Sequence, residues 1–142
     1  MLVLIIFVFF TPFFFVSCGG GDSGTDFSGF ELSTGKYVGG YWQAGNPFGF
    51  MLIVLPAAAL ALSFLHKKNA KIQSICRYLF FIAPIFDIFA GLVAWRAFKS
   101  YALAKIGQIP VTIGTRPGFV LYIAFNIALF AAGVADYFAK RE

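Results

Sequence analysis

The sequence predicts an all-α membrane protein: three transmembrane helices that follow an N-terminal leader, with a small extracytoplasmic cap. Two observations carry this prediction. Of the 142 residues, 60% are hydrophobic and 12% are charged, and the mean hydropathy is +0.83, so too few polar residues are present to cover a soluble domain. The apolar residues are also gathered into long runs, and runs of about 20 such residues are typical of helices that cross a bilayer.

Residues 1–17 form the first apolar run, which Thr11 and Pro12 interrupt. As a helix this run would be roughly 25 Å long, slightly shorter than a hydrocarbon core of about 30 Å. That length favours the apolar part of a secretory leader (signal peptide) over a stable span, although no Lys or Arg precedes the run. If the leader is retained, it becomes a fourth span.

Residues 18–47 follow as a glycine-rich segment with clustered acids and interleaved aromatic residues. Its first part is typical of a flexible tether, and the remainder is typical of turns or a short strand. We expect this segment to be extracytoplasmic. Residues 30–34 within it and residues 110–114 further along are candidates for a short strand pair in the predicted cap.

The predicted membrane helix bundle covers residues 48–138. Its parts, in order, are span 48–65, inside loop 66–77, span 78–95, outside loop 96–117 and span 118–138, before a cytoplasmic tail at 139–142. Each span is long enough to cross a bilayer as a helix. Pro56 and Pro84 lie inside the first two spans, where they are expected to kink the helices and where neighbouring helices can satisfy the freed backbone groups.

The loop at 66–77 sets the orientation. It holds four basic residues and no acid within 12 positions. The positive-inside rule therefore places this loop and the C-terminus in the cytoplasm, and a leader that delivers residues 18–47 outward gives the same orientation. Because membrane-spanning proteins of the outer membrane are usually barrels, we expect a multi-pass protein of the inner (cytoplasmic) membrane.

The first apolar run ends in a lipobox-like pattern. Phe15-Val16-Ser17-Cys18, followed by GGGDSG, resembles the leader of bacterial lipoproteins. The resemblance implies that Cys18 carries acyl chains such as palmitate, and that the leader is cut so that Cys18 becomes the first residue. Phe15 departs from the usual aliphatic residue. Two alternatives stay open: a retained span with an incidental cysteine, and an ordinary cleaved leader.

A second resemblance lies further along the chain. The segment SGFELSTG at 28–35 is similar to a GFxLxTG-like segment in small, uncharacterised bacterial membrane proteins that continue into several short apolar spans. This resemblance implies a multi-span membrane protein, and it implies no known activity.

Two polar residues inside the predicted spans are candidates for an intramembrane polar site. Asp87 lies near the middle of the second span, where a charged group costs about 2.5–3.5 kcal/mol to insert, so it should face the bundle or be protonated. Asn126 lies near the middle of the third span, where an amide usually bonds to a neighbouring helix. The functional interpretation is an ion or proton site. The structural alternative is a single polar contact between helices, which Asp87 and Asn126 can form together.

The sequence contains no motif that indicates catalysis, a metal or a cofactor. The two cysteines form no CxxC motif, the single histidine has no companion ligands, and no nucleotide-binding or hydrolase signature is present. The net charge of +5 is spread over loops without a basic stripe, so nucleic acid is not an expected partner.

The functional prediction is therefore a non-catalytic integral membrane protein, lipid-anchored at Cys18, that acts as a structural or accessory component of the bacterial envelope. Its predicted partners are the lipid bilayer and either another membrane protein or a second copy of the chain. The alternative function is an oligomeric ion or proton conductor, or a small transporter, that uses Asp87 and Asn126.

Overall fold

The computed structural model describes residues 1–18, 24–38, 41–65, 70–106 and 111–139. The elements in chain order are α1 (Leu2–Val8), β1 (Pro12–Cys18), β2 (Thr25–Ser28), α2 (Gly29–Thr34), β3 (Gly35–Val38), β4 (Tyr41–Ala44), the 3₁₀ turn η1 (Pro47–Phe50), α3 (Met51–Leu65), α4 (Ala70–Ile106), β5 (Val111–Thr115) and α5 (Pro117–Ala139).

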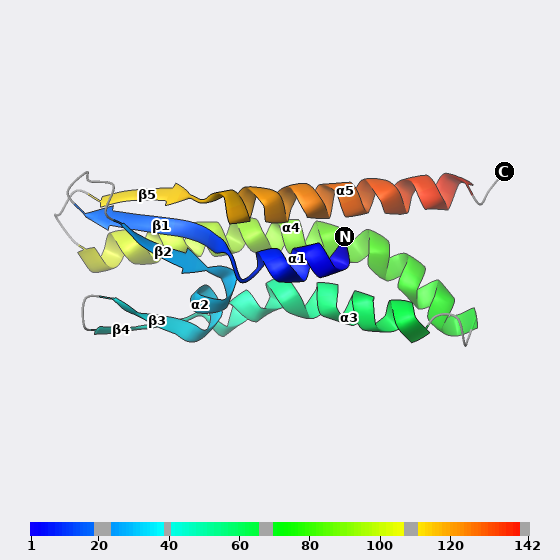
Figure 1. Cartoon of the computed structure of the whole chain (residues 1–142), viewed down its shortest axis with the longest axis horizontal. Coiled ribbons are helices and arrows are strands. Elements are labelled where there is room, and N and C mark those ends of the chain that lie inside the picture. Colours follow the sequence, from blue (N-terminus) through cyan, green and yellow to red (C-terminus); the bar gives the residue numbers. More distant parts are fainter. Residues whose placement is uncertain (19–23, 39–40, 66–69, 107–110, 140–142) are drawn as a thin grey trace.

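The three long helices α3, α4 and α5 run along the long axis of the molecule, and the strands gather at one end of it (Figure 1). Helix α4 packs against both α3 and α5, and the short helix α1 packs against α3 and α5. The fold is therefore a helical bundle that carries two small sheets.

The strands form two antiparallel sheets. The first has the order β2-β1-β5, so the N-terminal strand β1 lies in the middle and pairs with strands from distant parts of the chain. Phe15 of β1 lies opposite Asp26 of β2 on one side and Gly114 of β5 on the other. The second sheet is the hairpin β3–β4.

The prediction of an all-α fold is wrong. In the described part of the chain the fold is mixed, with five α-helices and two antiparallel sheets of three and two strands. The assumption that failed is that every long apolar run is a helix. Periodicity cannot distinguish a buried strand from a buried helix when a segment is apolar on every face.

The N-terminal run shows this most clearly, because residues 1–17 do not form one continuous helix. Helix α1 ends before Thr11, whose hydroxyl donates to the carbonyl oxygen of Val8 at 2.7 Å, and Pro12 then begins β1. Proline cannot continue a helix and favours an extended residue before it. The aromatic and β-branched residues that follow, PFFFV, suit a strand.

The predicted spans also need correction. Within the described residues, two helices are long and apolar enough to cross a membrane: Tyr78–Ser100 inside α4, and Pro117–Phe138 in α5. The apolar helix Met51–Phe64 is shorter than that, because the first residues of the predicted span 48–65 belong to the 3₁₀ turn η1. The predicted outside loop at 96–117 begins as a continuation of α4 to Ile106.

The predicted strand pair between 30–34 and 110–114 is wrong as well. A strand does form at Val111–Thr115, but it pairs with β1. Residues Gly29–Thr34 form helix α2, which begins with a capping box: the Ser28 side chain accepts from the backbone N–H of Glu31, and the Glu31 carboxylate accepts from the backbone N–H of Ser28.

Aromatic side chains join the sheet to the bundle. Phe13 and Phe14 of β1 are both fully buried, and a register irregularity between Pro12 and Phe14 accompanies this departure from strict alternation. The Phe14 ring contacts the rings of Trp95 and Phe98 on α4, while the Phe13 ring contacts those of Phe119 and Tyr122 on α5. Phe13 and Phe14 thus place β1 in the core, where the sheet meets the two helices.

Candidate functional site

Asp87 on α4 and Asn126 on α5 lie at the same level of the bundle. Two close approaches fix the register of these antiparallel helices. A Cβ added at Gly91 would contact the side chains of Phe119, Ile123 and Tyr122, and a Cβ added at Gly133 would contact the backbone of Phe80. Asp87 lies one turn before Gly91 on α4, and Asn126 lies one turn after Tyr122 on α5. Because the helices are antiparallel, these two steps run in the same direction and end at the same level. The structure brings together the two polar residues that the sequence selected.

Both side chains are closed off from the surface, with exposed fractions of 1% for Asp87 and 0% for Asn126. The amide nitrogen Nδ2 of Asn126 donates to the backbone carbonyl of Tyr122 at 3.0 Å. The oxygens Oδ1 of Asp87 and Oδ1 of Asn126 have no hydrogen-bond partner among the described residues. Two acceptor oxygens are thus buried in one interface without a donor, which is costly in an apolar interior.

Tyr122 completes this cluster and links it to α3. Its side chain is fully buried, and its hydroxyl donates to the backbone carbonyl of Leu52 at 2.8 Å. That carbonyl would normally accept from the backbone nitrogen four residues later, but this position is Pro56, which has no N–H. The Tyr122 hydroxyl therefore satisfies a backbone group that a proline leaves without a donor.

The second proline follows a similar arrangement. Pro84 in α4 leaves the carbonyl of Phe80 without its helical donor. Helix α5 covers this carbonyl with Gly133, where an added Cβ would lie 3.3 Å from the Phe80 oxygen. Both prolines are fully buried, so α5 seals the two positions at which α3 and α4 lose a backbone hydrogen bond.

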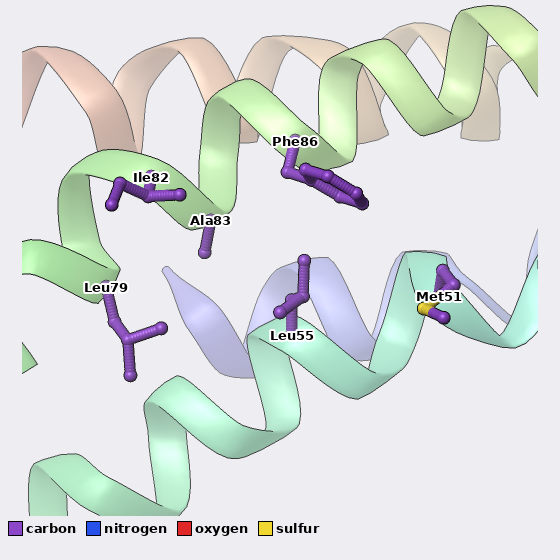
Figure 2. A pocket seen from close by; sticks show the side chains of 6 residues that line it. All are labelled: Met51, Leu55, Leu79, Ile82, Ala83 and Phe86. Atoms are coloured by element: carbon purple, nitrogen blue, oxygen red, sulfur yellow. The ribbon is translucent and has the colours of Figure 1, made fainter.

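An apolar pocket of about 220 Å³ lies between α3 and α4. Figure 2 shows Met51 and Leu55 on α3 facing Ala83 and Phe86 on α4. Leu79 and Ile82 complete the lining, which has no polar surface. Neither Asp87 nor Asn126 lines the pocket, so it offers no group for catalysis or for binding a charged ligand.

At the strand end of the molecule, two ion pairs tie the segments together. The Arg116 guanidinium Nε lies 2.7 Å from Oδ1 of Asp26, and the Lys36 ammonium lies 2.7 Å from Oε1 of Glu31. Burial raises the pKa of Glu31, but hydrogen bonds from Lys36 and Ser28, together with the Lys36 charge, outweigh burial and lower it. These partners account for both carboxylates as structural groups.

The predicted lipidation site lies at the end of β1. The backbone of Cys18 pairs with Val111 of β5, while the Cys18 side chain is outside what the structure describes. Cleavage before Cys18 would remove α1 and all but the last residue of β1. Six of the twelve buried hydrophobic residues in the described part of the chain would leave with them.

Sequence reasoning missed Tyr122, although a signal for it was present. A proline inside an apolar helix implies a carbonyl without a donor, and a hydroxyl-bearing residue in another helix is a candidate donor. The position of Tyr122, one turn before Asn126, places both polar groups on one face of α5.

The two donors of this cluster, the Tyr122 hydroxyl and Nδ2 of Asn126, are both bonded to backbone carbonyls, so the groups left without a partner are the acceptor oxygens of Asp87 and Asn126. Among the described residues, no three His, Cys, Asp or Glu side chains gather closely enough to hold a metal ion. No ion pair with a described basic residue reaches Asp87.

No protein-family model matches the chain, and no curated protein or solved structure shows significant similarity to it. The arrangement of its own residues is therefore the basis for any functional proposal.

Proposed function

We propose that this chain is a non-catalytic integral membrane protein that acts as a structural or accessory component of the bacterial envelope. The observation that carries the proposal is the inverted distribution of polarity in α4 and α5. The polar side chains Asp87, Tyr122 and Asn126 are fully buried. Large apolar side chains on the same helices face outward.

The outward-facing apolar residues extend along the whole bundle. On α4 and α5 they include Ile75, Ile85, Phe89, Leu92, Val93, Val120, Leu121, Ile127 and Phe138. A soluble monomer rarely exposes an apolar patch larger than a few hundred Å², and larger patches mark contact with lipid or with another protein. Two helices with the length and hydropathy of spans carry this surface, which supports membrane association.

The proposal includes a membrane location and an orientation. The inner membrane is the proposed location, with residues 18–47 extracytoplasmic and the C-terminus cytoplasmic, because the basic segment 66–77, whose residues 70–77 form the first turns of α4, follows the positive-inside rule. The strands β2 to β5 lie at the end of the bundle opposite to the start of α4 (Figure 1), so this placement puts both sheets outside the cytoplasm.

Single-cysteine labelling tests this placement in a background in which Cys18 and Cys76 are replaced by serine. Thr34→Cys, at an exposed position of α2, should react with a membrane-impermeant maleimide in intact spheroplasts. Phe138→Cys, exposed at the end of α5, should react only after permeabilisation. Ile127→Cys, exposed in the middle of α5, is the lipid-facing control and should stay unreactive. Labelling of Phe138→Cys alone in intact spheroplasts would reverse the orientation.

The accessory role requires a protein partner, either another membrane protein or a second copy of this chain. Native mass spectrometry of the full chain, extracted in a mild detergent, measures this directly. A complex above the monomer mass is expected. A monodisperse monomer without a co-purifying protein, also in lipid nanodiscs, would contradict the accessory role.

Acylation of Cys18 stays a prediction from the lipobox-like pattern. It conflicts with this fold if it proceeds with leader cleavage, since residues 1–17 supply the central strand β1. An anchored mature protein would therefore need a different core.

One observation favours a second candidate function, conduction of protons or ions. The two polar residues on which such a function would depend, Asp87 and Asn126, are both buried at the same level of the α4–α5 interface. Liposomes that contain the purified protein should then show a pH-gradient-driven flux that Asp87→Asn abolishes. An equal flux with the wild type and the variant would remove this candidate.

A further inference from the structure

The interface between α4 and α5 contains two acceptor oxygens and no described donor for either. Oδ1 of Asp87 and Oδ1 of Asn126 both lack a partner among the described residues, and both side chains are buried completely or almost completely. One hydrogen of the Asn126 amide group is used, because Nδ2 donates to the Tyr122 carbonyl. Rotating the amide would turn Oδ1 toward that carbonyl and place two acceptor oxygens together.

A single proton on Oδ1 of Asp87 would give both oxygens a partner, because it would turn that oxygen into a donor to Oδ1 of Asn126. A carboxylic acid donates one hydrogen bond, and an amide oxygen accepts it. Because the two residues lie at the same level on facing helices and both side chains are buried, this donor and this acceptor face the same interface. An ionised Asp87 would instead leave a charge beside an amide oxygen, without a described basic partner, in an apolar interface.

We propose that Asp87 and Asn126 form a buried proton-binding site. In this site the Asp87 carboxyl is protonated and donates a hydrogen bond to Oδ1 of Asn126. The proton comes from hydronium in the bulk solvent: one O–H bond of hydronium breaks and leaves water, an O–H bond forms at Oδ1 of Asp87, and the carboxyl becomes neutral. Helices α4 and α5 are then joined by a neutral acid–amide hydrogen bond.

The surroundings contain one further titratable group that faces Asp87. This is Tyr122 of α5, which is close enough to interact with Asp87 electrostatically and whose own proton is used on the Leu52 carbonyl. Helix α3 contributes that backbone carbonyl and Pro56, and α1 consists of apolar residues only. Loss of the Asp87 proton is therefore not compensated by a described neighbour, and the α4–α5 interface should weaken.

Infrared spectroscopy of the full chain with ¹³C-carboxyl-labelled aspartate, in lipid nanodiscs, tests the proposal. At neutral pH the spectrum should contain the C=O stretch of a protonated carboxyl. Asp87→Asn should remove this band, whereas Asp136→Asn, at an exposed position on α5, should leave it unchanged. In Asn126→Leu the band should shift to higher frequency because the hydrogen bond to the amide is lost.

A second measurement keeps the proposal testable if Asn126→Leu does not fold. Thermal unfolding of the wild type in nanodiscs should shift to lower temperature as the pH is raised above neutral. Asp87→Asn keeps a donor toward Asn126 and should lose most of this alkaline shift, while Asp136→Asn should retain it.

Three results would overturn the proposal: only ionised carboxylate bands at neutral pH, a carboxylate band that moves with added sodium, or an unshifted acid band in a folded Asn126→Leu protein. The sodium result would assign the site to a cation in place of a proton. The inference does not depend on conduction. A protonated Asp87 with no liposome flux would retain this site and remove only the conducting function.

Discussion

At Leu52, a backbone carbonyl that Pro56 leaves without a helical donor accepts a hydrogen bond from the Tyr122 hydroxyl. The contact joins α5 to α3 across the buried centre of the bundle. A proline in one helix and a tyrosine in another therefore act as one structural unit, and the loss of the hydroxyl should matter mainly because the proline is there.

This dependence can be measured with a double-mutant cycle. Tyr122→Phe should lower the free energy of unfolding by ~1–2 kcal/mol, because it leaves a buried carbonyl without a donor. In a Pro56→Ala background the new alanine supplies a backbone N–H to that carbonyl, so the same change should cost ~0.5 kcal/mol or less. Equilibrium unfolding in mixed micelles gives all four values. An equal cost in both backgrounds would show that the hydroxyl does not compensate for the proline.

Gly133 of α5 lies against the second carbonyl that a proline leaves without a helical donor, that of Phe80 in α4. An added Cβ would lie 3.3 Å from the Phe80 oxygen, and any larger side chain would push α5 away from α4. Gly133→Val should therefore destabilise the protein by ~1–3 kcal/mol.

The neighbouring Ala132 is exposed, and Ala132→Val is the matched control, with an expected change of ~0.5 kcal/mol or less. The same unfolding measurement serves for both. If the two variants were equally stable, close contact between α4 and α5 at Gly133 would be refuted.

At the scale of elements, helix α2 and the strand after it are held by charges that depend on pH. Glu31 accepts hydrogen bonds from Ser28 at the start of α2 and pairs with Lys36 of β3. Its pKa is lowered in the folded chain. A lowered pKa means that the ionised carboxylate stabilises the fold above its ordinary value of 4.5, and that this contribution is lost as the pH falls through the folded pKa.

Hydrogen exchange across α2 and β3 measures this contribution. Protection in the wild type should fall as the pH is lowered below about 4.5, after correction for the intrinsic exchange rate. Glu31→Gln should show lower protection at neutral pH, by ~0.5–1 kcal/mol, and little further change on acidification. Asp136→Asn, at an exposed position on α5 away from α2 and β3, is the control and should behave as the wild type. Identical acid sensitivity in Glu31→Gln would assign the effect to other groups.

Strand β1 connects the three-stranded sheet to the helix bundle. It is the middle strand of its sheet, and its phenylalanines contact α4 and α5. An apolar leader and a buried strand have the same composition, so residues 1–17 satisfy both patterns. The difference between the two is whether the rest of the chain offers partners for the backbone of that segment.

At the scale of the whole molecule, the described fold depends on whether the mature protein keeps residues 1–17. Six of the twelve buried hydrophobic residues in the described part of the chain belong to this segment. A chain that begins at Cys18 is therefore expected to lose cooperative thermal unfolding in nanodiscs. Cys18→Ser at full length removes the acylation site without removing β1, and it should unfold as the wild type does.

Intact mass of the membrane-extracted protein decides between the two states. The full-length mass is expected if the described fold is the mature one. A mass that lacks residues 1–17 and includes acyl chains would establish the lipobox prediction, and it would contradict β1 as part of the mature core.

The sequence by itself determined the apolar character of the chain, the positions of the long helices around residues 78–95 and 118–138, and the choice of Asp87 and Asn126. Each of these follows from local composition, because a charge-poor run and a polar residue within it are visible without tertiary information. Only the tertiary structure decided that residues 12–18 are a strand, that β5 pairs with β1, and that Tyr122 serves the carbonyl freed by Pro56. Strand pairing and hydrogen bonds between distant segments depend on which backbone groups meet in space, and a uniformly apolar sequence contains no periodicity from which to read that choice.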